Sequence, residues 1–173
     1  MPIVHFAAFD ILIVDLPPAI RMGAARLLVS RFLQGSNLTD LSSILRRVVD
    51  DESIPAAERA AAAVCLGSVK SPEAALKEVL LLAQELDEEL WLMCGKELRK
   101  LNRTAHSRRL LMRTVREGTN NDHRSNALWE LGFQNQFDEL LAAFHEGEIA
   151  PELYETLEMV FLELGRGATP FKC

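Results

Sequence analysis

A recurring helical unit constrains the fold of this 173-residue chain more than any other feature. Apolar residues are spaced as on one face of a helix almost from end to end, and glycine, proline or Asn/Asp clusters interrupt them every twelve to eighteen residues. A reference position in the second helix of each expected unit recurs at steps of 38, 32, 33 and 30 residues. The five reference positions are Arg21, Arg59, Trp91, Arg124 and Tyr154.

Two columns of this frame are apolar in all five units. The column three residues after the reference position holds mostly small residues, and the column seven residues after it holds Leu or Phe. The members are Ala24, Ala62, Cys94, Ala127 and Leu157 in the first column and Leu28, Leu66, Leu98, Leu131 and Phe161 in the second. A small side chain lets a neighbouring helix approach closely, and a Leu-sized one fills the space on the other side. The frame therefore predicts helices stacked between neighbours.

The frame predicts one all-α domain over residues 1–173, built from about five antiparallel helical hairpins. The hairpins are expected at about residues 3–34, 36–69, 71–102, 104–133 and 135–165, followed by a short tail at 166–173. Their first helices are expected at 4–14, 38–50, 72–85, 105–117 and 136–146. Ser71 followed by Pro72 is a typical helix start, with a capping side chain and a proline at the first helical position. Residues 1–15 fit either an opening helix or a strand-like cap over the end of the stack.

Two segments resemble a known repeat family: PAAERAAAAVCLGSVKSPEAALKEVLLLAQELD at 55–87 and HRSNALWELG at 123–132 are similar to HEAT-like repeats of the PBS-lyase type. The resemblance implies a right-handed α-solenoid, an α-α superhelix of stacked hairpins. It also implies that the arginine at the reference position helps to tie adjacent units together, a role that falls on Arg21, Arg59 and Arg124. Trp91 and Tyr154 depart from this pattern, so the tie is left unassigned in their units.

Charge and cysteine usage narrow the class of protein. A net charge of -6 disfavours a protein whose main partner is nucleic acid, because phosphates need basic side chains. The three cysteines lie far apart, which favours reduced thiols and a cytoplasmic protein. The apolar first fifteen residues lack a basic leader, and no other run approaches the length of a membrane span. We therefore expect no membrane partner.

The sequence contains no motif typical of an active site. Glycine-rich phosphate loops and a nucleophile elbow are absent, so no cofactor is predicted. The four histidines, at positions 5, 106, 123 and 145, form no metal-binding pair with each other or with a cysteine. The chain is therefore predicted not to be an enzyme and to have no catalytic or metal-binding residues.

Charge is distributed in bands along the chain. Residues 96–124 contain nine Lys/Arg and three Asp/Glu, whereas residues 130–163 contain nine acids and no Lys or Arg. Residues 73–89 add six acids and one lysine. In a solenoid these bands become neighbouring stripes. They either neutralise each other through side-chain pairs or present a charge-complementary docking surface to a partner.

Helical geometry also predicts one protein-binding face. In each unit, the first, fifth and ninth residues after the reference position lie roughly opposite the two packing columns. These residues should therefore line a concave surface. Aromatic residues and Met beside charges are typical of interface centres, and Trp129 is the expected anchor. The candidate residues are Arg26, Leu92, Lys96, Lys100, Trp129, Phe133, Glu155, Met159 and Glu163.

Three functions are compatible with these features. The first is a protein-binding scaffold or inhibitor, and more narrowly a bacterial immunity protein that neutralises a toxin or effector domain. The second is a HEAT-like DNA repair glycosylase that uses the basic band at 96–124 with Trp91 and Trp129. The third is a cofactor lyase or chaperone, for which Cys94 would be a candidate. The fold alone does not decide among these functions. The acidic residues on both sides of the basic band argue against DNA binding and favour the first function.

Overall fold

The computed structural model describes residues 38–68 and 70–165, and this part of the chain is entirely helical, with eight α-helices, one short 3-10 helix and no strand. The prediction of an all-α fold is thereby confirmed. The described residues divide into two compact units, one of residues 38–68, 70–85 and 100–102 and the other of residues 86–99 and 103–165.

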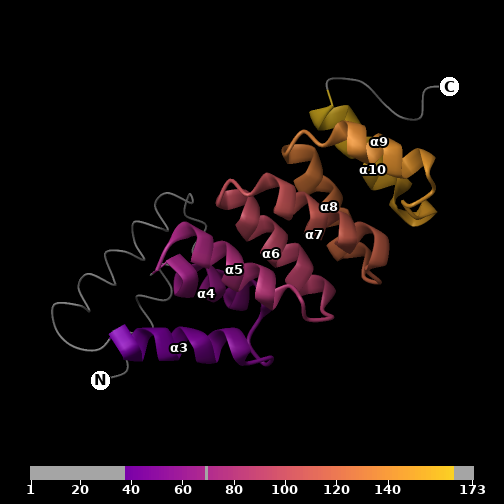
Figure 1. Ribbon diagram of the computed structural model, residues 1–173. Coiled ribbons are helices and arrows are strands. Elements are labelled where there is room, and N and C mark those ends of the chain that lie inside the picture. The colour runs from indigo at the N-terminus through magenta and orange to yellow at the C-terminus, as the bar shows by residue number, and fades with distance from the viewer. Residues whose placement is uncertain (1–37, 69, 166–173) are drawn as a thin grey trace. The chain divides into compact units, whose positions relative to one another are not determined.

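The described part of the first unit contains three helices, α3 (Leu38–Asp50), α4 (Ala56–Ser68) and α5 (Pro72–Leu82). Helix α4 contacts both α3 and α5, and Figure 1 shows α4 beside α5. Every residue of α4 from Arg59 to Ser68 is buried, which is the expected result for a helix covered on several sides. Gly67 allows the closest approach, because a side chain there would collide with the backbone of Ala75 on α5.

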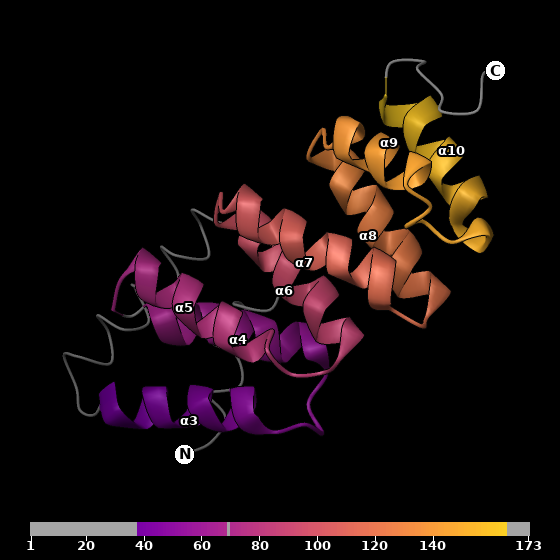
Figure 2. The same cartoon turned by 45° about the vertical axis from the view of Figure 1, so that its right-hand side comes forward.

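The second unit contains α6 (Glu88–Lys100, whose last residue falls in the first unit), α7 (Thr104–Glu117), α8 (Asn121–Phe133), α9 (Phe137–His145), the 3-10 helix η1 (Pro151–Leu153) and α10 (Tyr154–Leu164). Helix α8 contacts α7, α9, η1 and α10, and the turned view in Figure 2 shows α9 and α10 next to it. One core cluster spans the unit, from Leu92 and Leu111 through Leu128 and Leu131 to Leu157 and Phe161.

The helix positions agree closely with those expected from the repeat frame. The first helices expected at 38–50, 72–85, 105–117 and 136–146 are α3, α5, α7 and α9. The Ser71 side chain caps α5 by accepting a hydrogen bond from the backbone N–H of Ala74 at 3.0 Å, and Pro72 begins the helix. The hairpin expected at residues 3–34 and the tail at 166–173 lie outside the described residues. The single-domain organisation and the solenoid remain predictions.

Candidate protein-binding surface

Arg59 connects three parts of the first unit from a buried position. Its Nε donates to the backbone oxygen of Val49, in the last turn of α3, at 2.8 Å. Its Nη2 bonds Glu85 Oε1, after α5, at 2.7 Å. Carbonyls in the last turn of a helix have no partner within the helix, and a cation there also suits the helix dipole. The guanidinium therefore caps α3 and links it to the turn after α5.

Arg124 makes the equivalent contacts in the second unit. Its Nε donates to the backbone oxygen of Val115, in the last turn of α7, at 3.1 Å. Its Nη1 bonds Glu152 in η1 at 2.9 Å and also reaches Asn121. The same pair of contacts thus occurs at two of the three reference arginines. Arg21, the third, lies outside the described residues.

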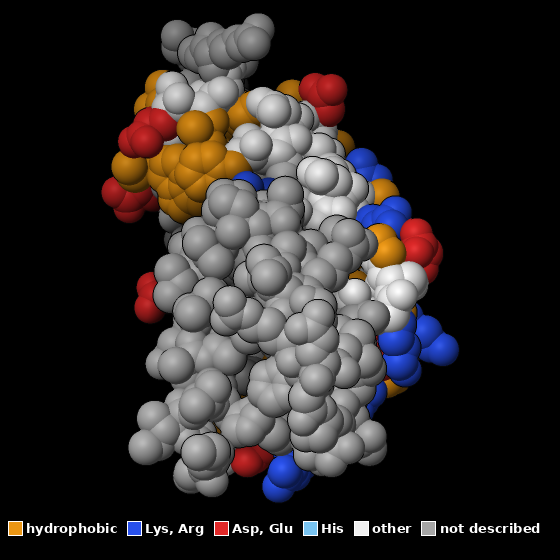
Figure 3. All heavy atoms as spheres, turned by 90° about the vertical axis from the view of Figure 1, so that its left-hand side faces the viewer, with side chains coloured by type: hydrophobic (Ala, Val, Ile, Leu, Met, Phe, Trp, Pro, Cys, Tyr) orange, Lys and Arg blue, Asp and Glu red, His pale blue; other side chains and the backbone are white. Residues whose placement is uncertain are grey.

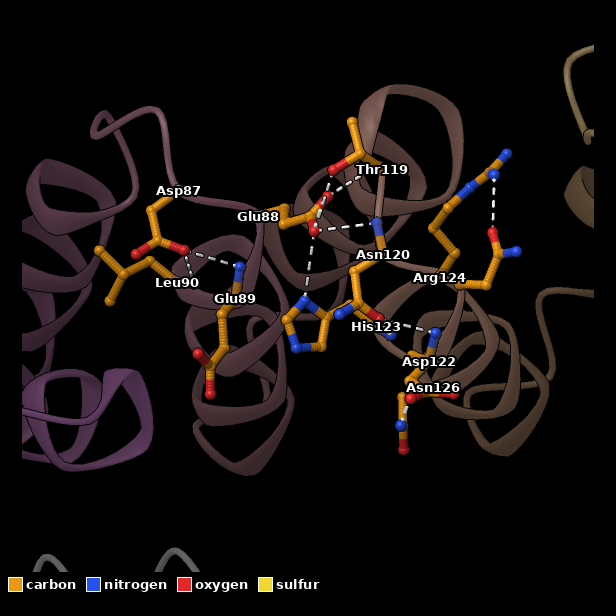
Figure 4. A network of polar contacts seen from close by, with 11 residues as sticks. Asp87, Glu88, Glu89, Leu90, Thr119, Asn120, Asp122, His123, Arg124 and Asn126 are labelled. Atoms are coloured by element: carbon orange, nitrogen blue, oxygen red, sulfur yellow. Dashed lines mark hydrogen bonds and ion pairs between the residues drawn. The ribbon is translucent and has the colours of Figure 1, made fainter.

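In the unit where Trp91 stands at the reference position, Glu88 on the same helix makes a link of a different kind. One carboxylate oxygen accepts a hydrogen bond from the backbone N–H of Asn120 at 3.0 Å, and the other accepts one from the backbone N–H of Thr119 (Figure 4). The His123 Nδ1 atom lies 3.5 Å from the same carboxylate. Trp91 itself is buried, and the guanidinium of Arg113 lies 3.8 Å from its ring centroid. A carboxylate on α6 therefore links this helix to the turn before α8.

The Glu88 carboxylate is held in its charged form. Partial burial raises the pKa of Glu88, but the hydrogen bonds from Thr119 and Asn120 and the neighbouring His123 ring outweigh it, so the pKa lies below the ordinary value of 4.5. Asn120 then caps α8 by accepting hydrogen bonds from the backbone N–H groups of Asp122 and His123.

The basic band is largely neutralised by acidic side chains about one repeat away. Arg108 pairs with Glu139 at 3.0 Å and Arg116 pairs with Glu148 at 2.6 Å, at sequence separations of 31 and 32 residues. Both Lys96 and Arg99 approach Glu130. The first of the two interpretations of the charge bands, mutual neutralisation, therefore accounts for most of these arginines.

Helices α8 and α10 lie side by side in the second unit, with small residues where they touch. The hydroxyl groups of Ser125 and Thr156 are 3.2 Å apart, one repeat from each other in sequence. A side chain at Gly132 would meet the Cγ1 atom of Val160 at 2.6 Å. Trp129 lies one turn after Ser125, and Met159 lies three residues after Thr156, so helical geometry places both near this line of contact.

Several apolar side chains remain exposed along these two helices. Phe133 is 55% exposed and Met159 is 44% exposed. Trp129 is partly buried against the core, and its ring centroid lies 6.2 Å from that of Phe133. Figure 3 shows, on one face, exposed hydrophobic side chains next to acidic ones. We call Trp129, Phe133, Glu155, Met159 and Glu163 the α8–α10 surface.

Five of the nine candidate residues thus fall on one pair of helices. The prediction was wrong for Leu92, which is 1% exposed and belongs to the core, where no partner can reach it. Lys96 is half-buried and approaches Glu130, and Lys100 lies at the end of α6. Arg26 lies outside the described residues.

Two features of the second unit were not predicted from the sequence. Leu162 is 54% exposed on α10, close to Met159, but it falls outside the repeat columns. Glu88 acts through backbone N–H groups some thirty residues away, and a sequence carries no side-chain signal for such partners.

Within residues 38–68 and 70–165, no group of three His, Cys, Asp or Glu side chains could hold a metal ion. Cys65 and Cys94 are buried. No helix in this part of the chain is both long and apolar enough to cross a membrane. Comparisons with family models, curated proteins and solved structures give no match.

Proposed function

We propose that this chain binds another protein through the α8–α10 surface. The observation that carries the proposal is the exposure of Phe133 and Met159 on two adjacent helices, beside the half-buried Trp129. Aromatic and Met side chains surrounded by charge are enriched at the centres of protein interfaces, where a few of them supply most of the binding energy. Phe133 and Met159 lie outside the core cluster, so core packing does not explain why these positions are apolar.

The basic band is a weaker candidate for a docking surface. Most of its guanidinium groups pair with carboxylates of the same unit, as at Arg108, Arg116 and Arg124. A nucleic acid partner would have to displace these pairs and then overcome the acidic residues of α9 and α10. This reasoning favours a protein partner over the DNA repair function.

We also propose that the architecture is a HEAT-like solenoid. The support is the repetition of contacts rather than a shared sequence. Arg59 and Arg124 each cap the preceding helix and bond a carboxylate in the following turn, at separations of 26 and 28 residues. Side-chain pairs such as Arg46 with Glu78 and Arg116 with Glu148 recur at a separation of 32 residues. A stack of equivalent units would produce this regularity.

The narrower hypothesis is that the chain is an immunity protein and that its partner is a toxin or effector domain encoded beside it. The test is to co-express the chain with each protein encoded in its gene neighbourhood and to measure complex formation by size exclusion and calorimetry. A stable complex with a toxic neighbour, together with rescue of growth, would support it.

The binding site is tested by substitution in that complex. Phe133→Ala and Met159→Ala should each weaken binding by about fivefold or more, because truncating an interface anchor commonly costs over 1 kcal/mol. Leu81→Ala is the matched control, since Leu81 is 51% exposed but lies on α5 in the other unit. If Leu81→Ala weakens binding as much as the other two, the α8–α10 surface is not the site.

A further inference from the structure

The C-terminal helix carries negative charge that the rest of the described chain does not neutralise. Glu155, Glu158 and Glu163 are exposed, and α10 contains no Lys or Arg. Within residues 38–68 and 70–165 none of the three forms an ion pair, whereas Glu139, Glu148 and Glu152 each pair with an arginine. The internal pairing between bands therefore ends before α10.

Two of these carboxylates share one face of α10 with an exposed apolar residue. Glu155, Met159 and Glu163 are spaced four residues apart, so they form a nearly straight line along the helix. At 1.5 Å per residue the two carboxylates stand about 12 Å apart along the axis, with Met159 midway. Phe133 and Trp129 lie along the neighbouring helix α8. On α10 the exposed Met159 thus lies between two exposed carboxylates, and the apolar residues of α8 lie beside them.

We propose that the partner segment seated on the α8–α10 surface is a cationic amphipathic helix. Its apolar side chains would contact Phe133 and Met159, and Lys or Arg side chains about two turns apart would face Glu155 and Glu163. This inference rests on the proposed protein-binding function and specifies the chemistry of the partner. The exposed carboxylates favour a cationic partner, because charge complementarity sets both the rate of encounter and the choice of partner.

Two other occupants fit the surface less well. Nucleic acid would bring phosphates against three unpaired carboxylates. A second copy of this chain would have to bring free basic groups, yet the arginines of the basic band in the second unit are mostly paired within it. The test below separates both from a cationic helix.

The experiment titrates the full chain with a synthetic peptide of about 15 residues, long enough for four helical turns, that carries a leucine stripe flanked by lysines. A matched peptide carries glutamate in place of lysine. Calorimetry measures the affinity of both at low and physiological salt. The lysine peptide should bind more tightly, and its affinity should fall as salt rises, because exposed charge pairs are screened.

Charge-neutralising variants locate the contact. The double variant Glu155→Gln with Glu163→Gln should weaken binding of the lysine peptide by roughly threefold to tenfold, as expected for two exposed charge pairs. The matched control is Glu52→Gln with Glu58→Gln, which makes the same charge change in the first unit at residues that form no ion pair within the described chain. The control should leave binding unchanged. Circular dichroism establishes that both variants are folded.

The outcomes separate this inference from the proposed function. Equal binding of the two peptides, or equal effects of the two double variants, overturns the cationic helix. If Phe133→Ala weakens binding of a natural partner but the Glu155→Gln with Glu163→Gln variant does not, the proposed function stands and this inference fails. Dimerisation of the chain that Met159→Ala abolishes, or binding of a DNA duplex in preference to the lysine peptide, overturns it too.

Discussion

Replacing Arg124 with methionine should destabilise the second unit far more than a typical surface substitution. The Arg124 side chain is 8% exposed, and its Nε supplies a hydrogen-bond partner to the backbone oxygen of Val115, a residue that is fully buried. Methionine keeps most of the apolar stem but donates no hydrogen bond. A hydrogen bond from a charged group contributes about 1.5 to 3 kcal/mol, and the carbonyl left behind is desolvated.

We therefore expect Arg124→Met to lower the free energy of unfolding by about 2 to 3 kcal/mol. For a chain of this size the midpoint of thermal unfolding should fall by roughly 4 to 12 °C. Urea and thermal denaturation followed by circular dichroism measure both quantities. Arg109→Met is the matched control on α7, since Arg109 is exposed and forms no ion pair or hydrogen bond within the described residues.

Two results would refute this reasoning. If Arg124→Met costs no more than Arg109→Met, the buried cap does not stabilise the unit. If Glu152→Gln alone costs as much as Arg124→Met, the half-exposed ion pair carries the stabilisation instead of the bond to Val115. The double variant then separates the two contacts, because removing partners of the same interaction is non-additive.

Three further predictions concern the joints between helices. Because the pKa of Glu88 is below 4.5 in the folded chain, its stabilising effect is complete above that pH and is lost as pH falls through the lower folded value. The stability gap between the natural chain and Glu88→Gln, measured by urea denaturation, should therefore narrow below pH 4.5. Gly67→Ala should cost about 2 kcal/mol or more in thermal unfolding, because its methyl group meets the backbone of Ala75. Ser107→Ala should cost about 1 to 2 kcal/mol, since the buried hydroxyl donates to the backbone oxygen of Gly95 at 2.7 Å.

Each of these three has its own control. A gap for Glu88→Gln that stays constant from pH 7 to pH 3 would contradict the role of the carboxylate. Gly147→Ala separates the two kinds of glycine, because Gly147 has a φ of 72° but open space around it. If Gly67→Ala costs less than Gly147→Ala, the α4–α5 contact is looser than described. Ser42→Ala on α3 should be nearly neutral, and an equal loss for Ser107→Ala would argue against the bond to Gly95.

The helices could be predicted because local signals agree with the repeat frame. Apolar spacing fixes where a helix must bury a face, and residues such as Ser71 and Pro72 fix where it starts. The repeat frame also placed Arg59 and Arg124 at equivalent positions, and the two side chains make equivalent contacts. The contact partners were not predictable, because Val49 and Val115 take part through their backbone oxygens.

The binding face was predicted less completely. A helical wheel gives the direction of each side chain but not the width of the buried stripe. For α10 the stripe is narrow, and Met159 stays exposed. For α6 it is wide, so that Leu92 is buried although it lies opposite the packing columns. Which case applies depends on how many neighbours cover the helix, and that is a property of the fold.

The link made by Glu88 has a consequence for exchanging parts of the chain. At the joints of Arg59 and Arg124 a cation approaches a turn that offers a carboxylate, whereas at Glu88 an anion approaches a turn that offers N–H donors. The joints therefore have opposite polarity: a cation on the helix at Arg59 and Arg124, and an anion on the helix at Glu88. A chain shortened by removing residues 104–133 would bring Glu88 toward the turn that contains Glu152, acid against acid. We therefore expect hairpins to be exchangeable only where the two joints have the same polarity.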